Sequence, residues 1–390
     1  MAPPKIIKAL DESEVICTYD ENNNPIVPKT TLRSTVKDVL DVFLPAGYPH
    51  SVTPDYTPYQ IYDSLQAFSS TIAGLLSARA VLQGFGVGDS TSSATAAVLF
   101  AVLQESTGRL ATILFAHRHG RAIEPECKFY RFLADIVNDS ALFLDVLSPV
   151  LPTYPKIIAI CGAGILRALC GISGGAAKAS LSAHFAKNGN LAELNAKDGS
   201  QETVISLLGM LAGSFFVHLV DGKVAVGASM IVLVGIHLWT NYQAVRSVQM
   251  RTLNRQRLTI ILDEASSHGV ILRPDEVAAK EHILTWTGPY ISFATTFPRL
   301  DEISNFKNQA YQHREYVIVV QSMATKIFLK QGATTMDALQ AWVEAYEGPR
   351  WASDRGFWET LKAAGWDLET NAMETGPAIR IVMGDEKKSA

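Results

Sequence analysis

TVISLLGMLAGSFFVHLV (Thr203–Val220) and VAVGASMIVLVGIHLWTNYQAV (Val224–Val245) are two apolar segments that contain no Asp, Glu, Lys or Arg. Only Asp221, Gly222 and Lys223 separate them. Because an α-helix rises about 1.5 Å per residue, a helix of the first segment extends about 27 Å, close to the ~30 Å hydrocarbon core of a bilayer. The pattern predicts a transmembrane helical hairpin, although a hairpin buried in a large soluble protein would have the same character.

Residues within and beside the hairpin indicate how it packs and which way it faces. Small side chains let helix backbones approach each other, and the hairpin contains Gly209, Ala212, Gly213, Gly227 and Ala228. Basic residues collect at both outer ends, namely Lys178, Lys187 and Lys197 before it and Arg246, Arg251, Arg255 and Arg257 after it. Since a hairpin has both outer ends on one side of a membrane, the positive-inside rule predicts that the C-terminal region faces the cytoplasm.

The composition favours a protein that is partly embedded in a membrane. Hydrophobic residues make up 48% of the 390-residue chain and charged residues only 18%. A net charge of −4 gives no reason to expect nucleic acid as a partner. The four cysteines form no CxxC pair, so neither a zinc site nor a disulfide framework is expected. The acidic start, with Asp11, Glu12 and Glu14, indicates neither a signal peptide nor a transit peptide.

The chain divides into three predicted regions. Residues 1–42 form a small soluble N-terminal segment, with a strand over Glu14–Tyr19 and a helix over Thr31–Phe43. Residues 43–258 form a mainly α-helical membrane domain. Beyond the hairpin it contains a helix from Gln60 to about residue 80, an apolar run over Ala94–Leu103 and helices at about 107–117, 129–150 and 156–172. Their ionisable residues are costly in a bilayer unless they face a bundle interior, so between two and six spans are expected.

Residues 259–390 are expected to form a small soluble α+β domain that ends in a short polar tail. The predicted elements are strands over Tyr316–Gln321, Lys326–Lys330 and Ala378–Met383, and helices over Thr335–Ala345 and Asp354–Ala363. The fold class is therefore mainly α, with a multi-pass helical membrane region followed by this α+β domain.

Three segments are candidates for ligand binding. The proline-punctuated segment Phe43–Phe68 is rich in tyrosine and holds the loop candidates Tyr48, Asp55, Tyr56 and Asp63. One interpretation is a ligand-binding or gating loop at the membrane surface, and the favoured alternative is an aromatic anchor at the membrane interface. Its prolines are expected to prevent a helix before Gln60.

The second candidate is the polar connection Lys178–Thr203, with Lys178, Asn195, Lys197, Asp198 and Gln201 as tentative ligand residues. It could hold an anionic small molecule at a helix N-terminus. The alternative is structural, because Asp198 and Gln201 have the spacing of a capping box that would open the hairpin. The third candidate is the arginine-rich segment after the hairpin, where Arg251 and Arg255 could bind lipid headgroups or a phosphorylated ligand.

No catalytic or metal-binding motif is visible. Gly84–Gly88 reads G-x-G-x-G, but it follows a predicted helix and not the strand that a dinucleotide site requires. His117 and His119 flank Arg118 without further suitably spaced ligands. Nucleophile elbow, HExxH, Walker A and paired catalytic carboxylates are absent from the sequence, so neither an enzyme nor a bound metal or cofactor is expected.

Six motifs in order resemble the root UVB sensitive (RUS) family, also described as the vitamin B6 photo-protection and homoeostasis family. They are LPAGYPHSVTPDYTPYQIYDSLQAF, GFGVGDSTSSATAA, STGRLATILFAHRHG, KFYRFLADIVND, NLAELNAKDGSQET and NYQAVRSVQMRTLNRQR. The resemblance is dense over about residues 40–260 and looser beyond. This chain departs from the plastid-associated plant members because its acidic N-terminus does not look like a transit peptide.

The resemblance implies a membrane-associated, non-enzymatic protein linked to vitamin B6 homeostasis and UV-B response. It implies no catalytic residues, and no motif shows a site for pyridoxal phosphate. The leading hypothesis is a multi-pass membrane protein that transports or senses a small anionic metabolite. The alternative is a membrane-tethered scaffold whose C-terminal domain recruits a protein, such as another RUS-family member or a second copy of this chain.

Overall fold

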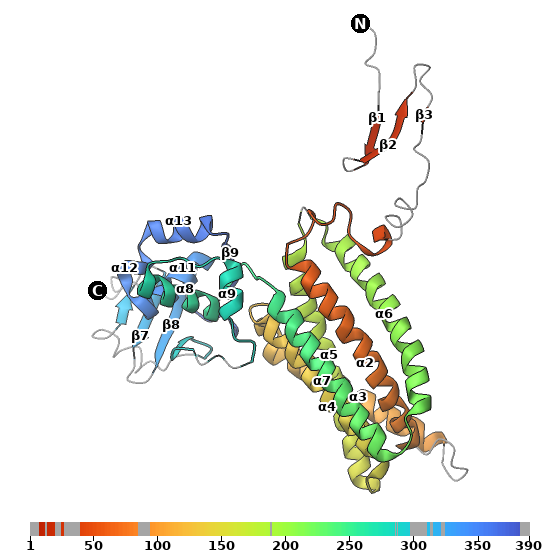
Figure 1. Cartoon of the computed structure of the whole chain (residues 1–390). Helices are drawn as coiled ribbons and strands as arrows, with labels where there is room; N and C mark the ends of the chain where they lie inside the picture. The colour runs from red at the N-terminus through yellow and green to blue at the C-terminus, as the bar shows by residue number, and fades with distance from the viewer. Residues whose placement is uncertain are drawn as a thin grey trace.

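The computed structural model shows a bundle of long helices followed by a smaller domain of helices and strands (Figure 1). It describes residues 8–11, 14–19, 25–26, 40–84, 94–187, 189–284, 286, 288–296, 310–312, 315–320 and 324–382. Strands β1 (Lys8–Asp11), β2 (Glu14–Tyr19) and β3 (Pro25–Ile26) form an antiparallel sheet, and β2 confirms the predicted strand. The helix predicted over Thr31–Phe43 lies mostly outside the described residues, although residues 40–43 are helical.

The bundle consists of long helices joined by short connections. They are α2 (Tyr56–Gly84), α3 (Ala94–Ile123), α4 (Cys127–Leu147), α5 (Thr153–Phe185), α6 (Leu191–Leu219) and α7 (Lys223–Ser247), with the 3-10 helix η1 (Ser148–Val150) after α4. Among the described residues, four helices are long and apolar enough to cross a membrane: α2, over Tyr56–Leu82, α5, α6 and α7. This number lies within the predicted range of two to six.

The α6–α7 hairpin is present, but α6 starts at Leu191, well before the apolar segment. The preceding residues are rich in Leu, Ala, Glu and Lys, which favour helix, so the expected polar connection extends α6 instead. The capping box predicted at Asp198 and Gln201 is therefore wrong, because Asn190 occupies the N-cap position. At the turn, Gly222 has a φ of +84°, a conformation that favours glycine.

The start of α2 also differs from the prediction. The helix begins at Tyr56 and not at Gln60, so Pro58 is its third residue. Proline is tolerated in a first helical turn because the N–H groups there have no partner within the helix. Pro58 therefore does not exclude a helix, whereas the earlier prolines do lie in the loop before α2.

Helices α3 and α5 are longer than predicted because no proline follows their first turns. The runs predicted separately at 94–103 and 107–117 form the single helix α3, and α5 continues past residue 172 to Phe185. The two helices approach closely at Gly108 and Gly164. A Cβ added to Gly108 would lie 3.2 Å from the Gly164 carbonyl oxygen, so glycine permits this contact.

The contact between α2 and α6 depends on two glycines of the hairpin. A Cβ added to Gly209 would lie 2.9 Å from Cβ of Thr71, and one added to Gly213 would lie 2.6 Å from Cδ1 of Leu75. Both distances are too short for a real side chain, so the packing role expected of these glycines is confirmed. Gly227 on α7 differs, because nothing lies within 4 Å of its added Cβ.

The bundle exposes apolar side chains and buries charged ones. On α6, Leu211 and Phe215 are 63% and 68% exposed, and on α7 Ile231 is 64% exposed. Asp139 and Asp145 of α4 are in contrast 2% and 0% exposed. Water outside such a bundle would favour the opposite distribution, whereas hydrocarbon outside it favours this one.

The C-terminal domain combines helices with a mixed sheet. Its helices are α8 (Arg255–His268), α9 (Pro274–Lys280), α11 (Thr335–Glu347), α12 (Pro349–Ala352) and α13 (Arg355–Ala363). The sheet contains β5 (Ile291–Phe293), β6 (Ala310–Gln312), β7 (Tyr316–Val320), β8 (Thr325–Lys330) and β10 (Arg380–Ile381), and β4 (Thr252–Asn254) pairs separately with β9 (Asp367–Ala372). Strand β8 is antiparallel to β7 and parallel to β5 and β10.

Sequence periodicity located five elements of this domain but did not predict α9, α12, β5, β6 or β9. Strands β7 and β8 and helices α11 and α13 lie at the predicted positions within two residues at each end, and β10 is shorter than the predicted strand. The core contains Trp342 of α11 together with Leu258, Ile261 and Leu262 of α8. Helix α8 thus packs in the C-terminal domain and crosses the boundary that the sequence placed at residue 258.

Candidate functional site

The interior of the bundle contains a set of polar and charged side chains, which we call the buried polar network. Its members are Asp63 and Gln66 on α2, Arg131, Asp135 and Asp139 on α4, and His237 and Asn241 on α7. Each is at most 8% exposed. Residues four apart lie on one face of a helix, so the sequence positions on α4 and on α7 direct their side chains to a common interior.

Arg131 connects α2 with α4 inside the network. Its Nη1 donates to both carboxylate oxygens of Asp135, at 3.1 and 3.0 Å, and its Nη2 donates to Asp63 Oδ1 at 2.8 Å and Gln66 Oε1 at 2.9 Å. Asp135 also accepts hydrogen bonds from the side-chain amides of Gln66 and Asn241. A buried charge requires such partners, because an unpaired one is strongly destabilising.

His237 connects α7 with both of the other helices. Its Nδ1 lies 2.8 Å from each carboxylate oxygen of Asp139. Its Nε2 lies 3.1 Å from Gln66 Nε2 and 3.6 Å from Asp135 Oδ2. Counting Asp63 as well, the network holds three carboxylates and one guanidinium. The surroundings of the imidazole therefore carry more negative than positive charge.

A second, smaller polar cluster lies further along the bundle. Asp145 of α4 is fully buried, forms an ion pair with Arg167 of α5 and accepts a hydrogen bond of 2.7 Å from Ser77 of α2. This cluster and the network confirm the expectation that the ionisable residues of α4 face the interior of the bundle. Among the described residues, no group of three or more His, Cys, Asp or Glu side chains is arranged to hold a metal ion.

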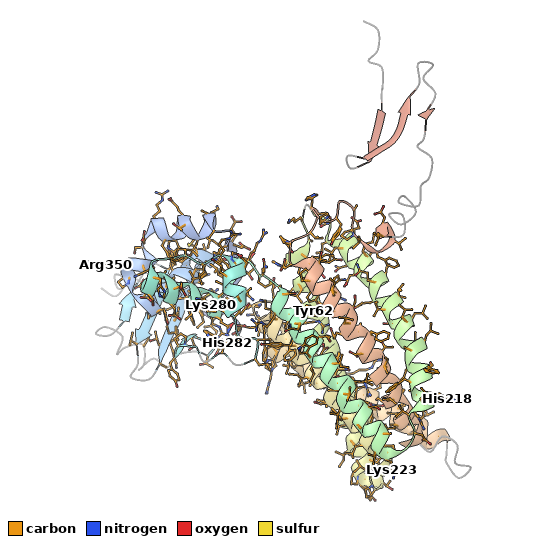
Figure 2. All side chains as sticks on the ribbon, viewed as in Figure 1. Tyr62, His218, Lys223, Lys280, His282 and Arg350 are labelled. Atoms are coloured by element: carbon orange, nitrogen blue, oxygen red, sulfur yellow. The ribbon has the colours of Figure 1, made fainter. Side chains whose placement is uncertain are left out.

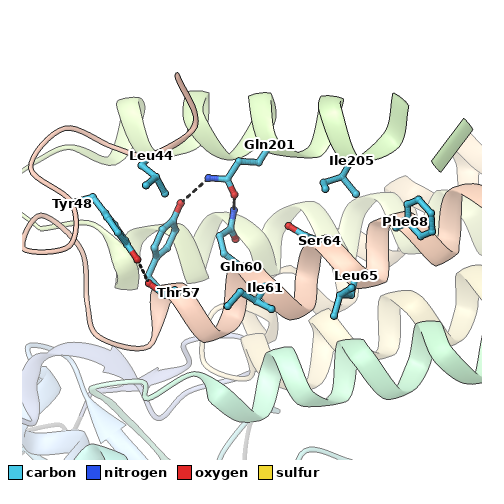
Figure 3. A pocket seen from close by; sticks show the side chains of 11 residues that line it. Leu44, Tyr48, Thr57, Gln60, Ile61, Ser64, Leu65, Phe68, Gln201 and Ile205 are labelled. Atoms are coloured by element: carbon cyan, nitrogen blue, oxygen red, sulfur yellow. Dashed lines mark hydrogen bonds between the residues drawn. The ribbon is translucent and has the colours of Figure 1, made fainter. Parts of the chain in front are cut away.

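A cavity of about 600 Å³, which we call the α2–α6 pocket, opens beside the network. Its walls are mostly apolar, with Leu44, Ile61, Leu65, Phe68 and Ile205 among them. Tyr48, Tyr56, Thr57, Gln60, Ser64 and Gln201 provide its polar groups. Figure 3 shows Gln60 and Gln201 pointing toward one another from α2 and α6, with 2.9 Å between Gln60 Nε2 and Gln201 Oε1. A mostly apolar pocket with few polar groups is typical of a small-molecule site.

The structure brings together three of the predicted ligand residues near this pocket. Lys178 of α5 lies 2.7 Å from Asp198 and 2.5 Å from Glu202, both on α6. Asp198 also accepts a hydrogen bond from Gln60. Gln201 donates to the carbonyl oxygen of Phe43 at 2.6 Å. The amine of Lys178 is therefore already paired with carboxylates, and the helix N-terminus expected beside Asp198 is not there.

Two other predicted ligand residues of α6 lie apart from this group. Asn195 is exposed, and Lys197 donates to the carbonyl oxygen of Asp41. Arg251 is exposed and lines a cavity of about 460 Å³ between the bundle and β9. Arg255 pairs with Glu126 at 3.2 Å. The seven predicted ligand residues therefore do not converge on one site.

The loop candidates have structural partners. The Tyr48 hydroxyl lies 2.7 Å from the Thr57 hydroxyl and lines the α2–α6 pocket together with Tyr56. Asp55 lies 2.9 Å from His184 Nε2 and accepts from the Gln249 backbone N–H at 2.6 Å. Burial alone would raise the pKa of Asp55, but His184 and the Gln249 N–H together lower it to about 2.

The fourth loop candidate, Asp63, belongs to the buried polar network, where Arg131 is its partner. Sequence reasoning missed Gln66, Arg131, His237 and Asn241 as members of this network. A signal was present, because His237 and Asn241 interrupt an otherwise apolar span at a spacing of four residues. Polar residues placed in this way are expected to face a helix partner and not lipid.

An apolar exterior, a charged interior and, among the described residues, four helices long and apolar enough to cross a membrane define the class: a helix bundle compatible with a membrane protein. The model of the vitamin B6 photo-protection and homoeostasis domain matches residues 29–269. The chain therefore belongs to the root UVB sensitive family, as the sequence motifs predicted.

Named relatives agree with this assignment. RUS family member 1 of Dictyostelium discoideum is 39% identical over 70% of this chain and 54% of its own length. Protein root UVB sensitive 3 of Arabidopsis thaliana is 30% identical over 85% of this chain and 83% of its own length. This chain thus spans about half of the Dictyostelium protein and most of the Arabidopsis one. No solved structure matches it.

Proposed function

We propose that this protein is a membrane protein that transports or senses a small anionic metabolite in vitamin B6 homeostasis. The buried polar network is the observation that carries this proposal. Keeping Arg131 and three carboxylates inside an apolar bundle is costly, and a bundle that only anchors another domain has no need of them. Ionisable residues inside membrane bundles usually mark paths for a substrate or an ion.

The distribution of side chains supports insertion of the bundle into a membrane with the C-terminal domain on the cytoplasmic side. Lys223, at the α6–α7 turn, lies at the end of the bundle away from the C-terminal domain (Figure 2). Arg246, at the other end of α7, donates to the Ala279 carbonyl oxygen of α9, and Arg255 and Arg257 belong to α8. The basic residues that follow the hairpin are therefore at the same end as the C-terminal domain. Carbonate extraction with protease protection of a C-terminal tag tests both points; release into the supernatant would contradict insertion.

The α2–α6 pocket is the proposed binding place for the metabolite. Its aromatic and amide groups suit a planar polar ring. Lys178 pairs with Asp198, which accepts a hydrogen bond from the pocket residue Gln60, and with one exposed partner, Glu202. An anionic group of the ligand would replace Glu202 beside Lys178, whose side chain is 26% exposed. Pyridoxal 5′-phosphate is the first ligand to test because the family description names vitamin B6. No enzymatic step is proposed.

The binding test uses full-length protein in lipid nanodiscs with pyridoxal 5′-phosphate and pyridoxine as probes. Lys178→Met is expected to weaken binding of the phosphate about tenfold or more, because a hydrogen bond to a charged group contributes about 1.5–3 kcal/mol. Gln201→Leu tests the pocket wall without a change of charge. Lys223→Met is the control, since Lys223 lies at the opposite end of the bundle. Equal binding by all the variants would contradict this site.

A scaffold role for the C-terminal domain is the second candidate. It is supported by a hydrophobic core that this domain forms for itself, centred on Trp342 and Tyr316. The proposed partner is another RUS-family protein or a second copy of this chain. Pull-down by the intact protein, compared with a variant in which exposed residues of α13 such as Arg355 and Glu359 are exchanged for alanine, tests whether this surface recruits a protein.

A further inference from the structure

The hydrogen bonds of the buried polar network determine how His237 is protonated. Arg131 can only donate, so the Gln66 side chain must turn its oxygen toward Arg131 and its amide nitrogen toward Asp135 and His237. The Gln66 amide then donates to Nε2 of His237, which must accept and therefore carries no proton. Nδ1 carries the proton and donates to Asp139 at 2.8 Å.

We propose that His237 is a proton-binding switch that couples the position of α2 to pH or to a proton gradient. A proton taken up at Nε2 would face the Gln66 amide, which is also a donor, so the 3.1 Å contact between them must break. Asp135 Oδ2, at 3.6 Å, is the acceptor within reach of the new N–H. Proton uptake thus exchanges an α2–α7 hydrogen bond for an α4–α7 ion pair.

Charged and titratable groups face His237 from several helices. Facing it are Asp135, Asp139 and Arg131 from α4 and Gln66 from α2, and Asp63 lies beyond Gln66. From α5, Cys170 lies near enough to interact with Asp135, Arg131 and Asp139. Lys178 of α5 also interacts with Asp63. With neutral His237 and neutral Cys170, the network and Lys178 together carry three negative charges and two positive charges, and one proton balances them.

The consequence of the switch falls on the α2–α6 pocket. Gln66 is held between Arg131 and His237, and Gln60, Ser64 and Phe68 on the same helix line the pocket. Loss of the Gln66–His237 bond removes a polar contact between α2 and α7, which still pack through apolar side chains. We expect α2 then to shift against α6. The inference deepens the proposed function by adding the proton as the coupled ion, but its test needs no metabolite.

The first experiment is ring ¹⁵N NMR of the full-length protein, labelled at histidine and held in lipid nanodiscs. The resonances of His237 are assigned by their loss in His237→Gln, with His282→Gln as the control because His282 is exposed. We expect Nε2 of His237 to gain a proton when the pH is lowered, as the hydrogen-bond geometry allows. Nε2 that stays unprotonated as the pH is lowered would overturn the proposal.

A second variant keeps the test decisive if His237→Gln does not fold. Gln66→Glu places a carboxylate opposite Nε2, so a proton on Nε2 gains an acceptor in place of the Gln66 amide donor, and the protonation midpoint should change. The histidine resonance whose pH midpoint changes in Gln66→Glu, but does not change in His282→Gln, is then assigned to His237. Hydrogen exchange of α2 should increase with the same midpoint. An unchanged protonation midpoint of His237 in Gln66→Glu would contradict the switch. Hydrogen exchange of α2 that does not depend on pH would also contradict it.

Discussion

Glu281→Gln is expected to destabilise the junction between the bundle and the C-terminal domain by about 3–5 kcal/mol. Glu281 follows α9 and accepts hydrogen bonds from Lys128 Nζ at 2.6 Å and Arg257 Nε at 2.9 Å. The side chains of Lys128, Glu281 and Arg257 are only 3%, 5% and 1% exposed. Glutamine preserves the shape of Glu281 but leaves two buried cations without a counter-charge, which is the origin of the cost.

The charges of this group predict an order among variants. Lys128, Arg257 and Glu281 together carry a net charge of +1. Lys128→Met leaves a balanced pair between Arg257 and Glu281, so it should cost far less than Glu281→Gln. Glu359→Gln is the matched control, because its pair with Arg355 is exposed and contributes less than about 0.5 kcal/mol.

Tryptophan fluorescence during thermal unfolding is the assay, because all tryptophans except Trp239 lie beyond residue 280 and report on the C-terminal domain. Burial alone would raise the pKa of Glu281, but Arg257 and Lys128 lower it below its ordinary value of 4.5. The stabilisation is therefore fully present above about pH 4.5 and lost as the pH falls through the lowered pKa. Equal midpoints for Glu281→Gln and Glu359→Gln at pH 7 would refute this reasoning.

Two further predictions concern the bundle. Gly213→Val should destabilise the α2–α6 contact by about 1–3 kcal/mol, since even a Cβ would lie 2.6 Å from Leu75. Thermal unfolding measures this loss of stability. Gly227→Val is the control and should lose less stability, because nothing lies within 4 Å of a Cβ added there. Asp55→Asn should cost about 2 kcal/mol at pH 7, because the carboxylate pKa of about 2 lies below its ordinary 3.8. That difference is present above about pH 4 and should vanish as the pH falls toward 2; denaturation at several pH values checks it, and a constant difference contradicts it.

The arrangement of secondary structure was largely readable from the sequence. The α6–α7 hairpin, strands β7 and β8 and helices α11 and α13 follow from hydropathy and periodicity, which act over a few residues. Predictions were wrong where a local sequence rule was applied without regard to the neighbouring residues. The residues around Asp198 look like a helix cap, but helix-favouring residues precede them, and α6 therefore starts earlier. A proline breaks a helix only beyond the first turn, and Pro58 lies within the first turn of α2.

The tertiary structure alone decided which polar side chains meet. Lys178 and Asp198 were recognised as polar residues, but their mutual pairing depends on how α5 and α6 cross. Arg131 reaches Asp63 across 68 residues of sequence, and His237 reaches Asp139 across 98. A sequence pattern shows which face of a helix is polar, whereas the rotation and crossing of three helices determine which faces touch. The sequence by itself therefore determined the family, the helical hairpin and most elements, and only packing assembled the buried polar network.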